Sequence, residues 1–335
     1  MKPLEGKGLP YGKGDPRAVL RRIEGPMQAV EAMLKDILST DDPFLKPVLD
    51  HLARGGGKRL RPALFLLSVE ACQGDPYEFV SVAAALECVH MASLVHDDVI
   101  DEADRRRGLP TVHRLWGTKA GVLAGDYLFA RAFSILAREG GPRVVERMAQ
   151  VISDLASGEL QQQNSLYRLD QSEEEYFQRI HQKTASFLGE CCRIAGIVTG
   201  QGEETQDALY RFGQRVGMGF QVIDDILDLV GDSQTLGKPA ASDLAAGILT
   251  LPVIYGLQDA ELGPRLREYL QDPPWGRARV EEARHLLLAS DAIGYTYRRA
   301  REFTEEGREA LASLPPGEAR DTLEDLARIL LLRSL

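Results

Sequence analysis

The chain has 335 residues, 44% of them hydrophobic, which is enough for one large core or two ordinary domains. Its 50 acidic residues outnumber its 40 Lys and Arg residues, and the net charge of −10 argues against a general nucleic-acid-binding protein. No uncharged apolar run approaches the roughly 18 residues of a membrane span, so we expect a soluble, cytoplasmic protein.

The chain begins with a segment, residues 1–14, whose Gly and Pro content predicts a flexible arm. From residue 15 onward nearly every long segment has helical periodicity, which predicts a single all-α domain over 15–335. The expected helices cover 15–38, 60–74, 80–93, 118–141, 172–194, 279–314 and 321–333.

Local signals mark the ends of these helices. Asp15 with Pro16 predicts a helix start, Ser172 with Glu175 predicts a capping box, and Gly140 predicts a helix stop. None of the cysteines, Cys72, Cys88, Cys191 and Cys192, forms a C-x-x-C pair. We expect them to be buried, reduced thiols.

Two acidic motifs of the form D-D-x-x-D are the most informative feature. The first comprises Asp97, Asp98 and Asp101, and the second comprises Asp224, Asp225 and Asp228. One copy alone is more often a solvated acidic helix end. The second copy lies among apolar residues, however, and carboxylates crowded on one helix face need cations. Oxygen ligands without a His/Cys cluster favour Mg²⁺, which usually takes further ligands from water and a phosphorylated substrate.

Basic residues support a phosphate ligand. "GGGKRLRP" places Lys58, Arg59 and Arg61 beside a glycine-rich turn, and Arg105–Arg107 follow the first acidic motif. We assign Arg59 and Arg105 to ion pairs with nearby acids, because a surface basic cluster is the simpler explanation for part of the set.

Several further residues are weak candidates when taken singly. Each has an ordinary explanation, as a surface lysine, a polar helix residue or a core histidine. They are Lys183, Thr184, Gln221, Lys238 and His90, the last of which lies two helical turns before Asp97. Asp126 and Glu159 could also line a cavity, but we interpret them as helix-packing or capping groups.

Taken together, these motifs resemble the trans-isoprenyl diphosphate synthases, or polyprenyl synthetases. The matching pieces are "GGGKRLRP", "HDDVIDEADRRRGLPTVH", "AGDYLFARAF", "KTA" and "GFQVIDDILDLVGD…LGKP", in the family's order across roughly residues 40–255. The resemblance implies an all-α orthogonal bundle around a deep central cavity, the isoprenoid synthase fold. It also implies a homodimer and about three Mg²⁺ ions per active site.

The resemblance also implies a role for each matching residue. Asp97, Asp101 and Asp224 would bind metal, with Asp98 supporting the first motif and Asp225 and Asp228 completing the second. The pocket for isopentenyl diphosphate would contain Lys58, Arg61, His90 and Arg107. The allylic diphosphate pocket would contain Arg106, Lys183, Thr184, Gln221 and Lys238.

The implied reaction is chain elongation. Ionisation of the allylic diphosphate leaves a carbocation, which the double bond of isopentenyl diphosphate attacks before a proton is lost. In this family, bulky residues five and four positions before the first motif tend to form the floor of the cavity. Here these positions are the small Ala92 and Ser93, so the growing product can extend past them. We expect an all-trans product of roughly C30–C45, made from farnesyl or geranylgeranyl diphosphate, with a twenty-carbon product second.

One position departs from the family pattern. The family usually has a lysine after the glycine in "GKxTLP", whereas "GILTLP" places Ile248 there. One cation near the allylic diphosphate is therefore missing, which leaves open a non-catalytic or regulatory subunit of a heteromeric synthase. A terpene cyclase is disfavoured by "DDILD" and "GGGKRLRP", and a purely structural helical protein is disfavoured by the joint set of motifs.

Overall fold

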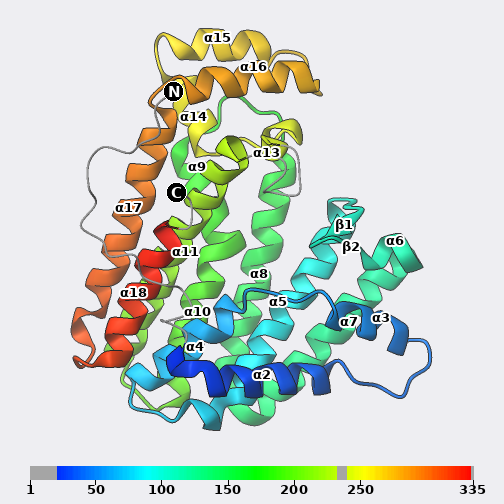
Figure 1. The fold of residues 1–335 in the computed structure, drawn as a ribbon, viewed down its shortest axis with the longest axis vertical. Coiled ribbons are helices and arrows are strands. Elements are labelled where there is room, and N and C mark those ends of the chain that lie inside the picture. Colours follow the sequence, from blue (N-terminus) through cyan, green and yellow to red (C-terminus); the bar gives the residue numbers. More distant parts are fainter. Residues whose placement is uncertain (1–20, 232–239, 333–335) are drawn as a thin grey trace.

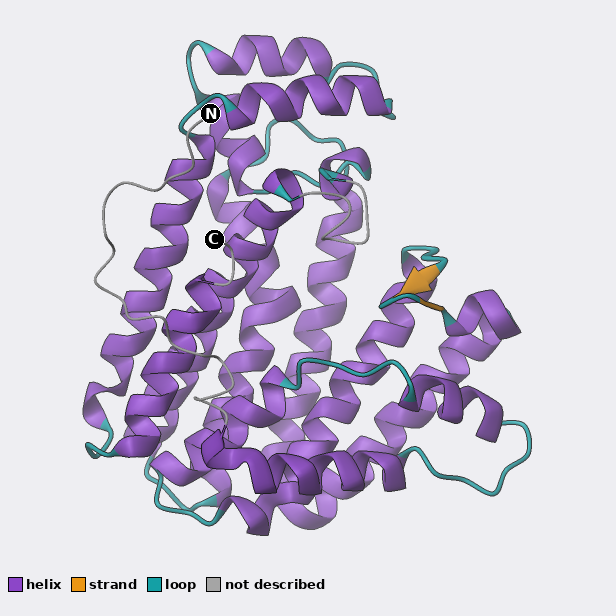
Figure 2. Ribbon diagram, in the orientation of Figure 1, coloured by secondary structure: helices purple, strands orange, loops and turns teal. Residues whose placement is uncertain are grey.

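The computed structural model describes residues 21–231 and 240–332, and its secondary structure is almost entirely helical (Figures 1 and 2). The exception in this part of the chain is an antiparallel ribbon of β1 (Arg105–Arg106) and β2 (Leu109–Pro110). The all-α class predicted from periodicity is therefore confirmed. The expected helix start at Asp15 lies outside the described residues.

Several helix ends follow the sequence signals, whereas the segment expected to be helical over 279–314 forms two helices, Arg277–Leu288 and Ala292–Ala310. The capping box at Ser172 and Glu175 is present, and the helical stretch that begins at Thr118 ends at Gly140. The first half contains η1 (Arg21–Ile23), α2 (Glu24–Ile37), α3 (Lys46–Ala53), α4 (Leu60–Ala71), η2 (Pro76–Phe79), α5 (Val80–Ile100), α6 (Val112–Trp116), α7 (Thr118–Ile135), η3 (Leu136–Gly140) and α8 (Pro142–Asn164). The second half contains α9 (Glu173–Ile180), η4 (His181–Ala185), α10 (Ser186–Val198), α11 (Glu203–Val230), α13 (Ser242–Ala245), α14 (Leu251–Gln258), α15 (Leu262–Tyr269), α16 (Arg277–Leu288), α17 (Ala292–Ala310), η5 (Leu311–Ser313) and α18 (Glu318–Leu332).

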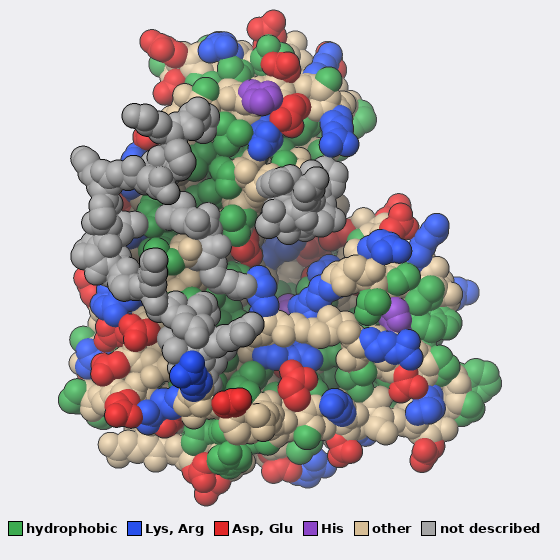
Figure 3. Space-filling model, in the orientation of Figure 1, with side chains coloured by type: hydrophobic (Ala, Val, Ile, Leu, Met, Phe, Trp, Pro, Cys, Tyr) green, Lys and Arg blue, Asp and Glu red, His purple; other side chains and the backbone are tan. Residues whose placement is uncertain are grey.

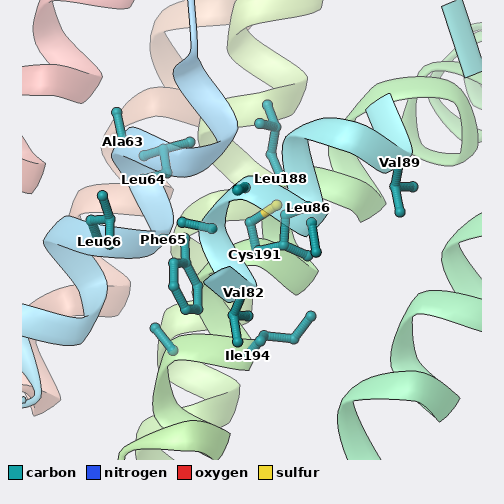
Figure 4. Close-up of a cluster of buried hydrophobic side chains, with 14 of the residues drawn as sticks. Ala63, Leu64, Phe65, Leu66, Val82, Leu86, Val89, Leu188, Cys191 and Ile194 are labelled. Carbon is teal, nitrogen blue, oxygen red and sulfur yellow. The ribbon is translucent and has the colours of Figure 1, made fainter. Parts of the chain in front are cut away.

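Two hydrophobic clusters hold the bundle together, and α11 belongs to both. Its N-terminal half contributes Phe212 to a cluster with α4, α5 and α10, and its C-terminal half contributes Val222 to a cluster with α14 and α16. Figure 4 shows part of the first cluster, where Phe65, Leu86 and Leu188 come from three different helices. All four cysteines are free and buried, as predicted.

Two helical stretches, Pro76–Ile100 and Thr118–Gly140, are long and apolar enough to cross a membrane by length and composition alone. Helices at the core of a globular bundle meet the same criteria, and more than half of the apolar window of the first stretch is buried inside the bundle. This stretch also carries the first acidic motif at its C-terminal end. We therefore interpret it as a core helix.

Glu190 on α10 provides a test of the packing. The side chain is 8% exposed, its Oε2 has no hydrogen-bond partner, and Arg193 Nε lies 3.8 Å from Oε1. Burial raises the pKa of this carboxyl from its usual 4.5 to about 7. Folding therefore takes up a proton between these two pH values, and the free energy of unfolding falls as pH rises through that range.

We expect Glu190→Gln to raise the melting temperature by a few degrees at about pH 8 and to change it little at about pH 5. Differential scanning calorimetry at the two pH values measures this difference. The exposed Glu282 on α16 gives the matched control, because Glu282→Gln removes the same charge without the burial. A Glu190→Gln effect of equal size at both pH values would contradict this account.

Candidate active site

A cavity of about 340 Å³ lies between the C-terminal end of α5, the C-terminal half of α8, the α9–η4 stretch and α11. Figure 3 shows a hollow in which acidic and basic side chains gather. Nine of the predicted site residues line this cavity: Arg61, His90, Ser93, Asp97, Asp101, Lys183, Thr184, Gln221 and Asp225. Residues separated by up to 164 positions in the chain therefore meet in one place.

The first acidic motif divides between the two faces of the last turn of α5. Asp97 and Asp101, four residues apart, both line the cavity, as the helical spacing predicts. Burial raises the pKa of the Asp97 carboxyl to about 6, and the nearby Glu159 carboxylate adds to the rise. Asp98 points elsewhere and forms an ion pair of 2.6 Å with Arg106. The supporting role expected for Asp98 stays a prediction.

The second acidic motif contributes mainly Asp225. This carboxylate is 4% exposed and accepts hydrogen bonds from the Tyr176 hydroxyl (2.7 Å) and Gln221 Nε2 (3.0 Å). Gln221 in turn accepts a hydrogen bond from Thr184 Oγ1 (2.9 Å), which joins the "KTA" segment to this motif. Burial raises the pKa of Asp225 to about 7, and nearby Asp243 adds to the rise.

The other two aspartates of the second motif do not line the cavity. Asp224 is half-buried on α11. Asp228 accepts hydrogen bonds from Ser242 Oγ (2.6 Å) and from the backbone N–H of Asp243 (3.1 Å), so its carboxylate anchors the start of α13. Their expected roles in metal binding and catalysis stay predictions.

The three arginines after the first motif form a tight hairpin. Arg107 and Gly108, at its tip, both have positive φ, as a two-residue turn between antiparallel strands requires. The hairpin places Arg106 and Arg107 in a second, smaller pocket of about 70 Å³, which shares Leu94 with the main cavity. The Arg107 guanidinium also donates to the carbonyl of Gly56, which ties the hairpin to the glycine-rich turn.

The arginines beside the glycine-rich turn have different roles: Arg59 forms ion pairs, whereas Arg61 lines the cavity. Arg59 forms ion pairs with Glu31 (2.6 Å) and Glu87 (2.9 Å), so its assignment to an ion pair is confirmed. Arg61 lines the cavity beside His90, with its guanidinium 4.6 Å above the Phe187 ring. Arg105 donates to the Gly108 carbonyl, and the predicted ligand Lys58 is exposed.

His90 is held as a neutral imidazole. Burial and the positive charges of Arg61 and other nearby arginines move its pKa well below the usual 6.5. A neutral ring beside Arg61 avoids adding a further buried positive charge to this side of the cavity.

Glu159 was interpreted wrongly from the sequence. It lines the cavity and forms an ion pair of 2.6 Å with Lys183. The missed signal is its spacing from Leu155 and Gln162, which lie four and three residues away on the same cavity-facing side of α8. Asp126 is largely exposed and lies 3.6 Å from His96, outside the cavity.

The sequence analysis also missed Tyr176 and Arg179, which line the cavity from α9. Their spacing from Lys183, seven and four residues, places all three on one helical face. The helix widens into a π-helical turn over His181–Ala185, an irregularity often found at functional sites. Asp243 and Thr250 also line the cavity. The sequence around them has no helical periodicity from which their position could be predicted. Lys238 lies outside the described residues.

The donor set fits Mg²⁺ better than a softer metal, because the cavity's possible metal ligands other than His90 are oxygen donors, chiefly carboxylates. The raised pKa values of Asp97 and Asp225 show that these carboxylates are crowded and desolvated without enough positive charge to offset them. Among the described residues, no three His, Cys, Asp or Glu side chains are already arranged to hold a metal. This arrangement suits an ion that takes its remaining ligands from water and a diphosphate.

A family model described as polyprenyl synthetase matches residues 42–287. The chain belongs to the polyprenyl synthetase family. It is 38% identical over 311 residues to heptaprenyl diphosphate synthase component 2 of Geobacillus stearothermophilus, covering 93% of this chain and 97% of that protein. It is also 38% identical over 328 residues to the chloroplastic solanesyl-diphosphate synthase 2 of Oryza sativa, covering 94% and 79%.

Solved structures of the family share the same fold. A polyprenyl synthase from Caulobacter crescentus, crystallised with calcium and isoprenyl diphosphate, matches with a TM-score of 0.90 at 32% identity, covering 97% of this chain and 100% of that one. A decaprenyl diphosphate synthase from Rhodobacter capsulatus matches with a TM-score of 0.88 at 33% identity, covering 96% and 100%. The protein is thus a prenyltransferase with the all-α isoprenoid synthase fold.

The hydrogen bond from Tyr176 to Asp225 generates a test of the site. We expect Tyr176→Phe to lower the free energy of unfolding by about 1–3 kcal/mol at about pH 8, because a buried carboxylate loses one of two neutral donors. Urea unfolding followed by circular dichroism measures the loss. In the control, Tyr295→Phe removes a bond of the same 2.7 Å length to Glu173, at a half-buried position that water can reach. Equal losses in the two variants would contradict the importance of burial here.

Proposed function

We propose that the protein condenses isopentenyl diphosphate with an allylic diphosphate and extends it to an all-trans polyprenyl diphosphate. The observation that carries this proposal is the cavity, in which carboxylates of both acidic motifs lie among Arg61, Lys183 and Thr184. Acids of this kind can hold metal–diphosphate complexes, and the cations can neutralise phosphate oxygens. Family membership independently supports the same substrates.

In the proposed mechanism, Asp97 and Asp101 on α5 and Asp224 and Asp225 on α11 would hold Mg²⁺. When bound, Mg²⁺ supplies Lewis-acid stabilisation of the departing diphosphate. The Lys183 ammonium exchanges its contact with Glu159 for a phosphate oxygen, and the Thr184 hydroxyl exchanges its hydrogen bond to Gln221 for one to a second phosphate oxygen. Cationic groups that are already in place stabilise the negative charge as the C–O bond breaks and the diphosphate keeps the bonding electrons.

The isopentenyl diphosphate would bind on the side of the cavity formed by Arg61 and His90, beside the Arg106–Arg107 hairpin. From there its double bond attacks the allylic cation to form the new C–C bond. The proton lost afterwards passes to an oxygen of the released diphosphate. The proposed mechanism therefore requires no base from this chain. The apolar cavity walls formed by Leu94, Leu155 and Ile180 keep water from the cation.

The proposed product is roughly C30–C45, with a twenty-carbon product as the second candidate. Ser93 lines the cavity, whereas Ala92 is fully buried in the neighbouring core. Relatives named for heptaprenyl, solanesyl and decaprenyl products support the longer range. Farnesyl or geranylgeranyl diphosphate is the proposed primer, and a cytoplasmic location stays a prediction.

A homodimer is the proposed assembly. Large apolar side chains on α7 and α8, Leu123 (63% exposed) and Leu160 (65% exposed), are candidates for burial against a second copy. A partner of different sequence is the second candidate, because one relative is named as component 2 of a synthase. The acidic motifs are complete here, which favours the catalytic member of any such pair.

The proposed activity is tested by mass spectrometry of products from isopentenyl diphosphate, Mg²⁺ and, in turn, dimethylallyl, geranyl, farnesyl and geranylgeranyl diphosphate. We expect a ladder that ends at one chain length, no product after chelation of Mg²⁺, and about a 10²–10³-fold lower rate for Asp97→Asn. Glu282→Gln, on the surface, is the matched control with an unchanged rate. Absence of elongation with every primer by the folded wild type would contradict a stand-alone synthase.

The placement of Ser93 generates a separate prediction about product length. Ser93→Phe should project a ring into the cavity and shorten the final product by at least one five-carbon unit, measured in the same assay. Ala92→Phe should mainly lower the melting temperature, because its side chain would enter a packed core. If Ser93→Phe leaves the product length unchanged, the growing chain follows another path.

A further inference from the structure

Arg179 is a buried cation for which the described residues provide no ion-pair partner. It projects from α9, is 4% exposed and lines the cavity. Its hydrogen bonds reach only uncharged acceptors: Gln171 Oε1 at 2.7 Å, Ser165 Oγ at 3.3 Å and the Leu249 carbonyl at 2.6 Å. Arg59, by contrast, is paired with both Glu31 and Glu87.

An isolated positive charge in such a place is unfavourable. Arginine keeps its charge in proteins, and burying a charge without a counter-ion is strongly unfavourable. The partial compensation comes from the Tyr176 ring, 5.6 Å from the guanidinium, whose hydroxyl is bonded to Asp225. The arrangement is therefore incomplete until an anion enters the cavity.

Arg179 also has donors left for such an anion. Of the five N–H donors of arginine, three are used in its hydrogen bonds, which leaves two available. Thr250 lies on the same cavity wall, 6% exposed, and its hydroxyl has no hydrogen-bond partner among the described residues. We call Arg179, Thr250 and the neighbouring Ile248 the Arg179 subsite.

We propose that the Arg179 subsite binds phosphate oxygens of the allylic diphosphate, with Arg179 as a binding residue additional to those expected from the family motifs. This inference rests on the proposed function. The guanidinium donates to the carbonyl of Leu249, the residue that follows Ile248, so the positive charge lies against the segment in which the expected lysine is replaced by a hydrocarbon side chain. A cation supplied from α9 can therefore act where Ile248 cannot.

A purely structural role is the competing explanation. Arg179 connects the end of α8, the loop before α9 and the segment before α14 through Ser165, Gln171 and Leu249. A structural clamp would lower stability and disturb both substrates alike. A phosphate ligand would change the affinity for the allylic diphosphate selectively.

The first test is calorimetric titration of farnesyl diphosphate into the full chain with Mg²⁺ and without isopentenyl diphosphate. We expect Arg179→Gln to raise the Kd by about 10- to 100-fold, while the KM for isopentenyl diphosphate changes little. Arg168→Gln is the matched control, because Arg168 is an exposed arginine on the loop before α9, paired with Asp170 and Glu175 outside the cavity. An unchanged Kd in folded Arg179→Gln, or an equal loss for both substrates, would overturn the proposal.

The second test leaves the hydrogen bonds of Arg179 in place. Ile248→Lys and Ile248→Glu add opposite charges to the subsite, so we expect the first to lower and the second to raise the Kd for farnesyl diphosphate. Ile248→Lys should also restore affinity in the Arg179→Gln background without restoring its melting temperature. If Ile248→Lys and Ile248→Glu change the Kd for farnesyl diphosphate in the same direction and by the same amount, the proposal is overturned. This outcome does not depend on whether Arg179→Gln folds. A wild type that neither binds nor elongates farnesyl diphosphate overturns the proposed function itself, and this inference with it.

Discussion

The burial of carboxylates around a shared cavity is the constraint on which this structure depends. Asp97 comes from α5 and Asp225 from α11, and burial raises the pKa of both. Left alone, such groups would take up protons or turn toward solvent. The carboxylates cannot turn toward solvent, because α5 and α11 are fixed by large apolar cores on their other faces. The folded protein therefore holds a site that is completed by cations.

The basic side of the cavity is held in place by a buried ion pair. Glu87, 2% exposed in the core, pairs with Arg59, which adopts a positive φ at the start of α4. This ion pair positions the glycine-rich turn, and the next residues carry Arg61 to the cavity. The hairpin after α5 is then joined to the same turn through Arg107 and Gly56. Structural ion pairs thus position the cations that remain available for a substrate.

The sequence predicted the residues that sit on regular elements with clear periodicity. Helical spacing was sufficient to bring Asp97, Asp101 and His90 to one face, and all three line the cavity. Helical spacing did not reveal the ion pair of Asp98, because the partner Arg106 comes from a hairpin that no alternating pattern predicts. Glu159 was also missed, because its spacing from Leu155 and Gln162 marks one face of α8 but does not reveal that Lys183 lies opposite that face.

Product length is harder to derive from sequence than reaction type for a related physical reason. The reaction requires a few charged groups at fixed spacings, and these stand out in a chain. Length depends on apolar side chains below Ser93, where Val89 and Leu86 are fully buried in a core shared with α4 and α10 (Figure 4). A growing hydrocarbon chain must displace or pass such side chains, at a cost set by how far their neighbours can yield. Chain length is therefore a property of packing among several helices, and no single motif encodes it.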